Sequence, residues 1–191
     1  MSQILHFPKG GEPTLAANEW LLWNGMQDEV ASLKSLDPTD PLHKVLLPFS
    51  WWRSQIHSHP HESDLITKAN QGQIGVWFAA DDDILEHAEL IEAGKKVWPL
   101  VAAHFPIFRD GRSFSTAALL RDRFGWDKEI RMIGDVLIDQ LLQGAQVGFD
   151  SFALRHDQDL SLALKQFNLF TVSTQNSWRG KRTVRTLIHA E

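Results

Sequence analysis

The chain has 191 residues, of which 43% are hydrophobic and 23% charged, with a formal net charge of −5 and no cysteine. The length suits one soluble domain, and the lack of cysteine excludes disulfides, thiolate catalysis and cysteine-ligated metal centres. A negative charge without a basic tract argues against a broad nucleic-acid or anionic-membrane surface.

Residues 1–41 are predicted to form an N-terminal extension to a single α/β domain over 42–191. We expect a short strand at 4–7, which the prolines and glycines of 8–13 end. Residues 19–36 suit either a helix or a strand. The Asp-Pro-Thr-Asp-Pro turn at 37–41 marks the expected boundary. The N-terminus shows no signal peptide and no apolar run is long enough for a membrane span, so we expect a cytoplasmic protein.

From position 45 onward, apolar strands alternate with helical segments. Strands are expected at 45–49, 74–79, 100–105, 130–133, 151–154, 170–173 and 183–189, and helices at 64–70, 84–96, 116–124, 136–146 and 160–167. This alternation predicts a mostly parallel sheet of repeated β-α units. The sheet is either doubly wound or an incomplete, barrel-like (β/α) array, whose open edges need covering by the N-terminal region or a partner chain.

Charged residues follow two neighbouring strands where each strand ends. Arg109, Asp110 and Arg112 come after the strand at 100–105, with Gly111 allowing a turn and Ser115 placed to cap the next helix. Paired guanidiniums beside a helix start favour a small oxyanion. The alternative is a set of ion pairs between these arginines and nearby aspartates.

The next strand carries the second charged group, Arg131, Asp135, Asp139 and Gln140. We expect Arg131, Asp135 and Gln140 to complete the anion site, with Asp135 capping its own helix or holding an arginine. A carboxylate fixed by an arginine is a poor general acid at neutral pH, because its pKa is lowered. Positioning is therefore favoured over proton transfer, for which Asp135 and His156 are the weaker candidates.

Two further groups have weaker interpretations. His57, His59 and His61 would converge on one metal if their segment were extended, but Ser58 and Pro60 favour a solvated loop. A basic tail is expected to be a solvated strand edge; its residues are Arg179, Lys181, Arg182 and Arg185.

The eight tryptophans are expected to fill the core, or in part to form an exposed interface. No dinucleotide fingerprint, phosphate loop or nucleophile elbow is present, so no cofactor is predicted.

Three segments resemble a bacterial family labelled "oxidoreductase probably involved in sulfite reduction", domain of unknown function 934. They are Phe-Pro-Ile-Phe-Arg-Asp-Gly-Arg-Ser-Phe-Ser at 105–115, Ile-Arg-Met-Ile-Gly-Asp-Val-Leu-Ile-Asp-Gln-Leu at 130–141 and Gly-Phe-Asp-Ser-Phe at 148–152. The chain departs from the family pattern at three positions, Ser113 for Gly, Phe114 for Tyr and Val147 for a common Cys. The missing Cys argues against a thiol-based redox mechanism.

The resemblance implies a role in sulfate assimilation, because members are typically encoded beside assimilatory sulfite reductase and the sulfonucleotide reductase. The leading hypothesis is an accessory protein that binds a small oxyanion or docks on one of these reductases. The alternatives are an oxidoreductase with an unidentified cofactor at the same rim, and an assembly module that pairs two chains.

Overall fold

The computed structural model describes residues 3–23, 44–58, 64–169 and 177–180. The strands are β1 Gln3–His6, β2 Thr14–Ala17, β3 Trp20–Leu22, β4 Lys44–Pro48, β5 Ile74–Phe78, β6 Leu100–Phe105, β7 Glu129–Gly134 and β8 Ser151–Phe152. The helices are α2 Phe49–Ser58, α3 Asp64–Asn70, α4 Ala88–Val97, α5 Arg112–Asp122, α6 Leu141–Val147 and α7 Leu160–Gln166, with a 3₁₀ turn, η1, at Ile138–Gln140. In these residues, none of the helices has the length and apolar character needed to cross a membrane.

All eight of these strands belong to one curled sheet in the order β2-β1-β8-β7-β6-β5-β4-β3. Strands β3 to β8 pair in parallel, whereas β1 runs antiparallel to both β2 and β8. The sheet is therefore mixed, and the prediction of a mostly parallel sheet is corrected. The reason is the short connection from β1 to β2, where the Gly11 N–H donates to Pro8 O at 3.0 Å, because so short a link joins antiparallel strands.

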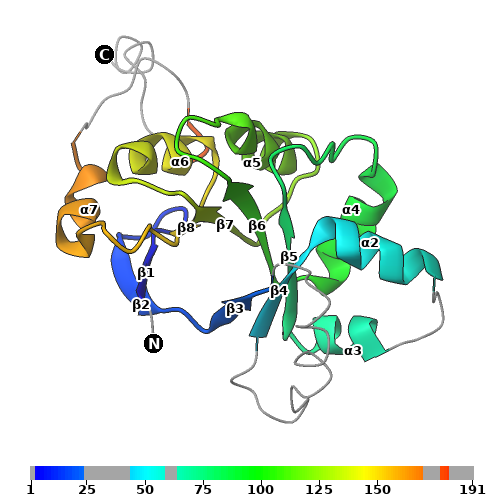
Figure 1. The fold of residues 1–191 in the computed structure, drawn as a ribbon. Coiled ribbons are helices and arrows are strands. Elements are labelled where there is room, and N and C mark those ends of the chain that lie inside the picture. Colours follow the sequence, from blue (N-terminus) through cyan, green and yellow to red (C-terminus); the bar gives the residue numbers. More distant parts are fainter. Residues whose placement is uncertain (1–2, 24–43, 59–63, 170–176, 181–191) are drawn as a thin grey trace.

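The two edge strands, β2 and β3, are consecutive in the chain and are separated by Asn18 and Glu19 alone. One extended segment thus pairs with β1 at its start and with β4 at its end, which brings the two sheet edges together (Figure 1). Residues 3–22 contribute three strands to the common sheet. The predicted boundary at 37–41 and the strands expected at 170–173 and 183–189 lie outside the described residues.

The helices lie on the outer side of the curl, and the inner side is lined by strands (Figure 1). Side chains alternate between these faces. On β6, Val101, Ala103 and Phe105 pack into the large outer core with the helices, whereas Leu100 and Ala102 belong to a smaller inner cluster. The alternation decides which charged residues can reach the helix side of the sheet.

Local structure differs from the predictions in three places. The strand expected at 45–49 ends at Pro48, and residues Phe49–Ser58 form α2, because Phe49, Trp52 and Ile56 recur at helical spacing and face the outer core. Helix α5 begins at Arg112, so Ser115 lies inside the helix and is not its cap. The helix expected at 136–146 is divided into η1 and α6.

Gly134 ends β7 and permits the chain to turn toward the site. Its φ is +97°, and a Cβ there would lie 2.3 Å from Phe105 O. Gly72 also has a positive φ, +78°, but nothing lies within 4 Å of an added Cβ there. A side chain at Gly72 would therefore cause backbone strain alone, whereas one at Gly134 would add a steric clash. We expect Gly72→Ala to lower the free energy of unfolding by about 1 kcal/mol, and Gly134→Ala to lower it further. Urea unfolding followed by tryptophan fluorescence measures both, and equal losses would contradict the close approach.

Candidate functional site

The first motif segment and the second leave the sheet side by side. Strands β6 and β7 pair in parallel with Phe105 opposite Gly134, and the Asp135 N–H donates to Phe105 O at 2.8 Å. Both segments therefore emerge at the carboxyl ends of the strands, the edge at which parallel α/β sheets bind ligands. We call residues 106–111 the β6–α5 loop.

Asp135 holds this loop through its side chain. Its Oδ2 accepts from the Phe108 N–H at 2.7 Å, and its Oδ1 accepts from Arg155 Nη1 at 2.7 Å. The hydrogen bond from Arg155, followed by that from Phe108, holds the pKa of Asp135 below its ordinary value. The carboxylate is thus ionised at neutral pH and acts by positioning its neighbours.

Gln140 holds the other backbone polar group of Phe108, the carbonyl oxygen. Its Nε2 donates to Phe108 O at 2.9 Å, while its Oε1 accepts from the Leu137 N–H at 3.0 Å. Both backbone polar groups of Phe108 are therefore bonded to side chains of the 130–141 motif. The two long motifs that carry the family resemblance meet physically at this point.

The tip of the β6–α5 loop is apolar and exposed. The exposed fractions are 48% for Ile107 and 41% for Phe108, and Arg109 beside them is exposed as well. Within the described ranges, no hydrogen bond or ion pair joins Arg109 to another residue. The loop therefore presents two apolar side chains and one unpaired cation on a backbone that is held in place.

Arg112 is paired inside its own loop. Its Nε donates to Asp110 Oδ1 at 2.9 Å and its Nη2 to Asp110 Oδ2 at 2.6 Å, which is the two-pronged geometry of guanidinium and carboxylate. Arg112 lowers the pKa of Asp110, and Asp110 raises the pKa of Arg112. Gly111, with a φ of −88°, is the cap residue of α5 and does not need the conformational freedom of glycine.

Arg131 lies on the other face of the sheet. Its neighbours Ile130 and Met132 belong to the outer core, so its own side chain faces inward, where it is 4% exposed. The predicted site on Arg109, Arg112 and Arg131 is corrected here, because the structure does not bring the three guanidiniums together.

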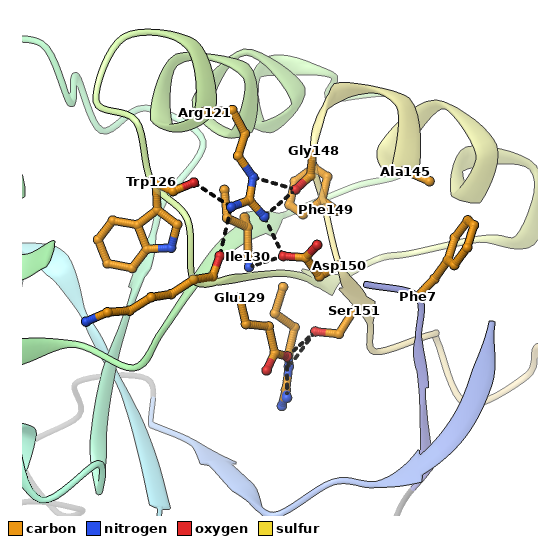
Figure 2. A network of polar contacts seen from close by, with 12 residues as sticks. Phe7, Arg121, Trp126, Glu129, Ile130, Ala145, Gly148, Phe149, Asp150 and Ser151 are labelled. Atoms are coloured by element: carbon orange, nitrogen blue, oxygen red, sulfur yellow. Dashed lines mark hydrogen bonds and ion pairs between the residues drawn. The ribbon is translucent and has the colours of Figure 1, made fainter. Parts of the chain in front are cut away.

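The inner face supplies Arg131 with its own partners. Its Nη2 donates to Glu129 Oε1 at 2.8 Å, its Nε to Ser151 Oγ at 3.0 Å and its Nη1 to Asn18 Oδ1 at 3.0 Å. Glu129 and Ser151 are seen below the strands in Figure 2. This guanidinium thereby ties β7 and β8 to the link between the two edge strands.

Arg155 joins the site from the connection after β8. Besides Asp135, it binds Asp157, with Nε–Oδ1 at 2.7 Å and Nη2–Oδ2 at 2.8 Å, and it lowers the pKa of Asp157 strongly. The sequence shows that Arg155 follows a strand, but it does not show which carboxylates Arg155 binds. The neighbouring His156 is exposed. The charges of this rim are therefore largely compensated, apart from Arg109.

The metal hypothesis finds no support in the described part of the chain. His57 lies in the last turn of α2, whereas His59 and His61 fall outside the described residues. The described residues hold no group of three or more His, Cys, Asp or Glu that would bind a metal ion.

Comparison with known proteins adds one finding. The family model "Bacterial protein of unknown function (DUF934)" matches residues 75–185, which is more than half of the chain. The chain belongs to the DUF934 family. The match includes both halves of the site, β6 with its loop and β7 with Asp135 and Gln140. No curated protein and no solved structure matches the chain.

Removing the charge of Asp135 should release the β6–α5 loop. In Asp135→Asn the amide hydrogen of Phe108 should exchange at least about tenfold faster, because a charge-assisted hydrogen bond contributes about 1.5–3 kcal/mol. Asp139→Asn, an exposed aspartate in η1, is the matched control and should leave the exchange unchanged. NMR measures the exchange rate of the Phe108 amide in both variants. Equal rates would show that Asp135 does not hold the loop.

The hold of Asp135 should also depend on pH. Because Arg155 and the Phe108 N–H keep its pKa below the ordinary value of about 3.9, the contact stabilises the folded state above that value. The stabilisation is lost as the pH falls through the lower, folded-state pKa. A carboxylate NMR titration should place the midpoint of Asp135 below about 3.9, and Arg155→Met should raise it. A midpoint that does not move in Arg155→Met would contradict the ion pair.

Proposed function

We propose that this chain is an accessory protein of sulfite reduction that docks on a reductase through the β6–α5 loop. The proposal rests on the exposed ring of Phe108 and on the hydrogen bonds that fix its backbone. Its ring is 41% exposed, although both of its backbone groups are held by side chains from the neighbouring strand unit. The family resemblance supports sulfite reductase, or the sulfonucleotide reductase, as the partner and a cytoplasmic setting.

A pre-ordered apolar tip is suited to binding another protein. Ordering a free loop opposes association, and this loop is already fixed by Asp135 and Gln140. Moving the ring of Phe108 or the side chain of Ile107 from water into a partner contributes about 1.5–3 kcal/mol each when burial is complete. Such an aromatic anchor on a rigid backbone is typical of the few residues that dominate binding energy.

The charges around the tip indicate what the partner surface offers. Asp110 neutralises Arg112, and Asp135 with Asp157 neutralises Arg155. Arg109 thus contributes positive charge beside the apolar tip. A complementary partner has an apolar socket with a carboxylate at its margin, and pairing across that margin would fix the orientation of docking.

Truncating the anchor tests the proposal directly. Phe108→Ala should weaken binding to purified sulfite reductase at least about tenfold, because truncating a hot-spot side chain costs about 2 kcal/mol or more and a tenfold change needs only about 1.4 kcal/mol. Leu162→Ala is the matched control, since Leu162 is 50% exposed on α7, away from the loop tip. Biolayer interferometry with both variants gives the two dissociation constants.

Thermal unfolding of each variant first establishes that the fold is intact. Binding that is unchanged in Phe108→Ala, or weakened equally in Leu162→Ala, would contradict docking through the loop. If wild-type protein binds neither sulfite reductase nor the sulfonucleotide reductase, the assignment to sulfur reduction fails.

A further inference from the structure

Residues 177–180 form a turn that packs against α6. Arg179 of the predicted basic tail lies in this turn, whereas Lys181, Arg182 and Arg185 lie outside the described residues. The Gly180 N–H closes the turn on Ser177 O at 3.0 Å, and the Trp178 N–H donates to Gln146 O at 2.8 Å. The side chain of Arg179 is only 6% exposed. Its Nε donates to Ala145 O at 3.1 Å, and its Nη2 donates to the backbone oxygens of Phe7 and Phe149.

A second buried guanidinium, that of Arg121, lies beside this turn. All of its donors are used: Nε and Nη2 bind Gly148 O, Nη1 binds Trp126 O and Lys128 O, and Nη2 also binds Asp150 Oδ2. Figure 2 shows Arg121 enclosed by these groups. Arg121 therefore has no donor left for a further ligand, and it fixes Asp150 in place.

Positive charge exceeds negative charge in this region. Asp150 Oδ2 already accepts from Arg121 and from the Ile130 N–H, and Asp150 Oδ1 is 3.9 Å from Arg179 Nη2, too far for a hydrogen bond. Lys9 adds a third cation, with Nζ 4.0 Å from the Trp178 ring, whose centre is 4.6 Å from Arg121 Cζ. Two buried guanidiniums, those of Arg121 and Arg179, therefore lie around one buried carboxylate, and Lys9 lies against the neighbouring Trp178 ring.

Burial makes this excess charge unfavourable. Desolvation, together with the smaller effect of the neighbouring Arg121, lowers the pKa of Arg179 to about 10, although Asp150 acts in the opposite direction. Desolvation likewise lowers the pKa of Arg121. An added negative charge would therefore be stabilised here more strongly than at an exposed lysine or arginine.

The same turn buries donors without acceptors. In the part of the chain that the structure describes, Arg179 Nη1, Trp178 Nε1 and Ser177 Oγ are buried and have no hydrogen-bond partner. Folded proteins leave few buried polar groups unpaired, and these three come from consecutive residues. Lys9 and Gly180 are exposed, so the cluster extends to the surface. A ligand that complements these unpaired donors and this positive charge is an anion with several hydrogen-bond acceptors.

We propose that the cluster formed by Lys9, Arg121, Asp150 and residues 177–179, which we name the Arg179 cluster, binds a small doubly charged oxyanion such as sulfate, sulfite or phosphate. Arg179 Nη1 donates to the anion, and Lys9 contributes charge from the exposed side. The site is distinct from the β6–α5 loop, and it does not depend on docking to a reductase.

The indole N–H of Trp178 reports on this site in ¹⁵N NMR spectra, once its signal is assigned by its loss in Trp178→Phe. Titration with sodium sulfate, sulfite or phosphate should shift it saturably, whereas sodium chloride at equal ionic strength should not. Arg179→Lys should raise the dissociation constant about tenfold or more, because a charge-assisted hydrogen bond is lost.

Matched variants separate this site from general charge effects. Lys9→Gln keeps the buried groups and should weaken binding to a smaller degree, whereas the exposed Lys96→Gln should not weaken it. Arg112→Ala should also leave binding unchanged, because it alters only the rim. Lys9→Gln keeps the test decisive if Arg179→Lys does not fold.

Three results would overturn the proposal. The first is an equal response to chloride. The second is anion binding lost in Arg112→Ala but kept in Lys9→Gln and Arg179→Lys. The third is binding of acetate as tight as that of sulfate, which would show that the cluster binds carboxylates and does not prefer doubly charged oxyanions.

Discussion

The carboxylate of Asp135 fixes the relative positions of the segments that form the candidate site. One carboxylate at the end of β7 binds the loop after β6 through Phe108 and the connection after β8 through Arg155. Three successive strand ends are thereby locked in one arrangement. These contacts hold the backbone of Phe108, although its side chain and that of Ile107 are exposed.

Two buried arginines perform the corresponding task for the sheet itself. Arg121 lies on the helix side and bonds to the connections on either side of β7, whereas Arg131 lies on the inner face and bonds to Asn18 in the link between the edge strands. A buried charge is tolerated when its donors find acceptors, and every nitrogen of these two guanidiniums has a hydrogen-bond partner. Arg179 differs, since its Nη1 has no acceptor in the described residues, and for this reason it is the one to which we assign a ligand.

The sequence predicted the local elements better than their long-range relations. The strands β4 to β8 were recognisable because each is a short apolar run, and the positions of Asp135 and Gln140 after β7 followed from that alternation. The antiparallel pairing of β1 with β8 was not predictable, because it joins residues about 145 positions apart and no local pattern encodes it.

The same limit explains the corrections at the candidate site. Arg131 was assigned to the rim because strand periodicity does not reveal which face of a sheet meets the helices. Arg179 was assigned to solvent because its partners are distant in the sequence: they come from the residue after β1, from α6 and from the turn before β8. The helical spacing of Phe49, Trp52 and Ile56 was a signal present in the sequence, but Phe49 was assigned to the preceding strand and residues 50–56 were given no element.

A pre-ordered β6–α5 loop that binds the partner should be protected from solvent in the complex. Hydrogen–deuterium exchange of the chain mixed with sulfite reductase, followed by peptide mass spectrometry, measures this protection. We expect slower exchange in residues 106–111 and in the segment 135–140 that holds them, with no change in α7. Slower exchange elsewhere, with 106–111 unchanged, would contradict it.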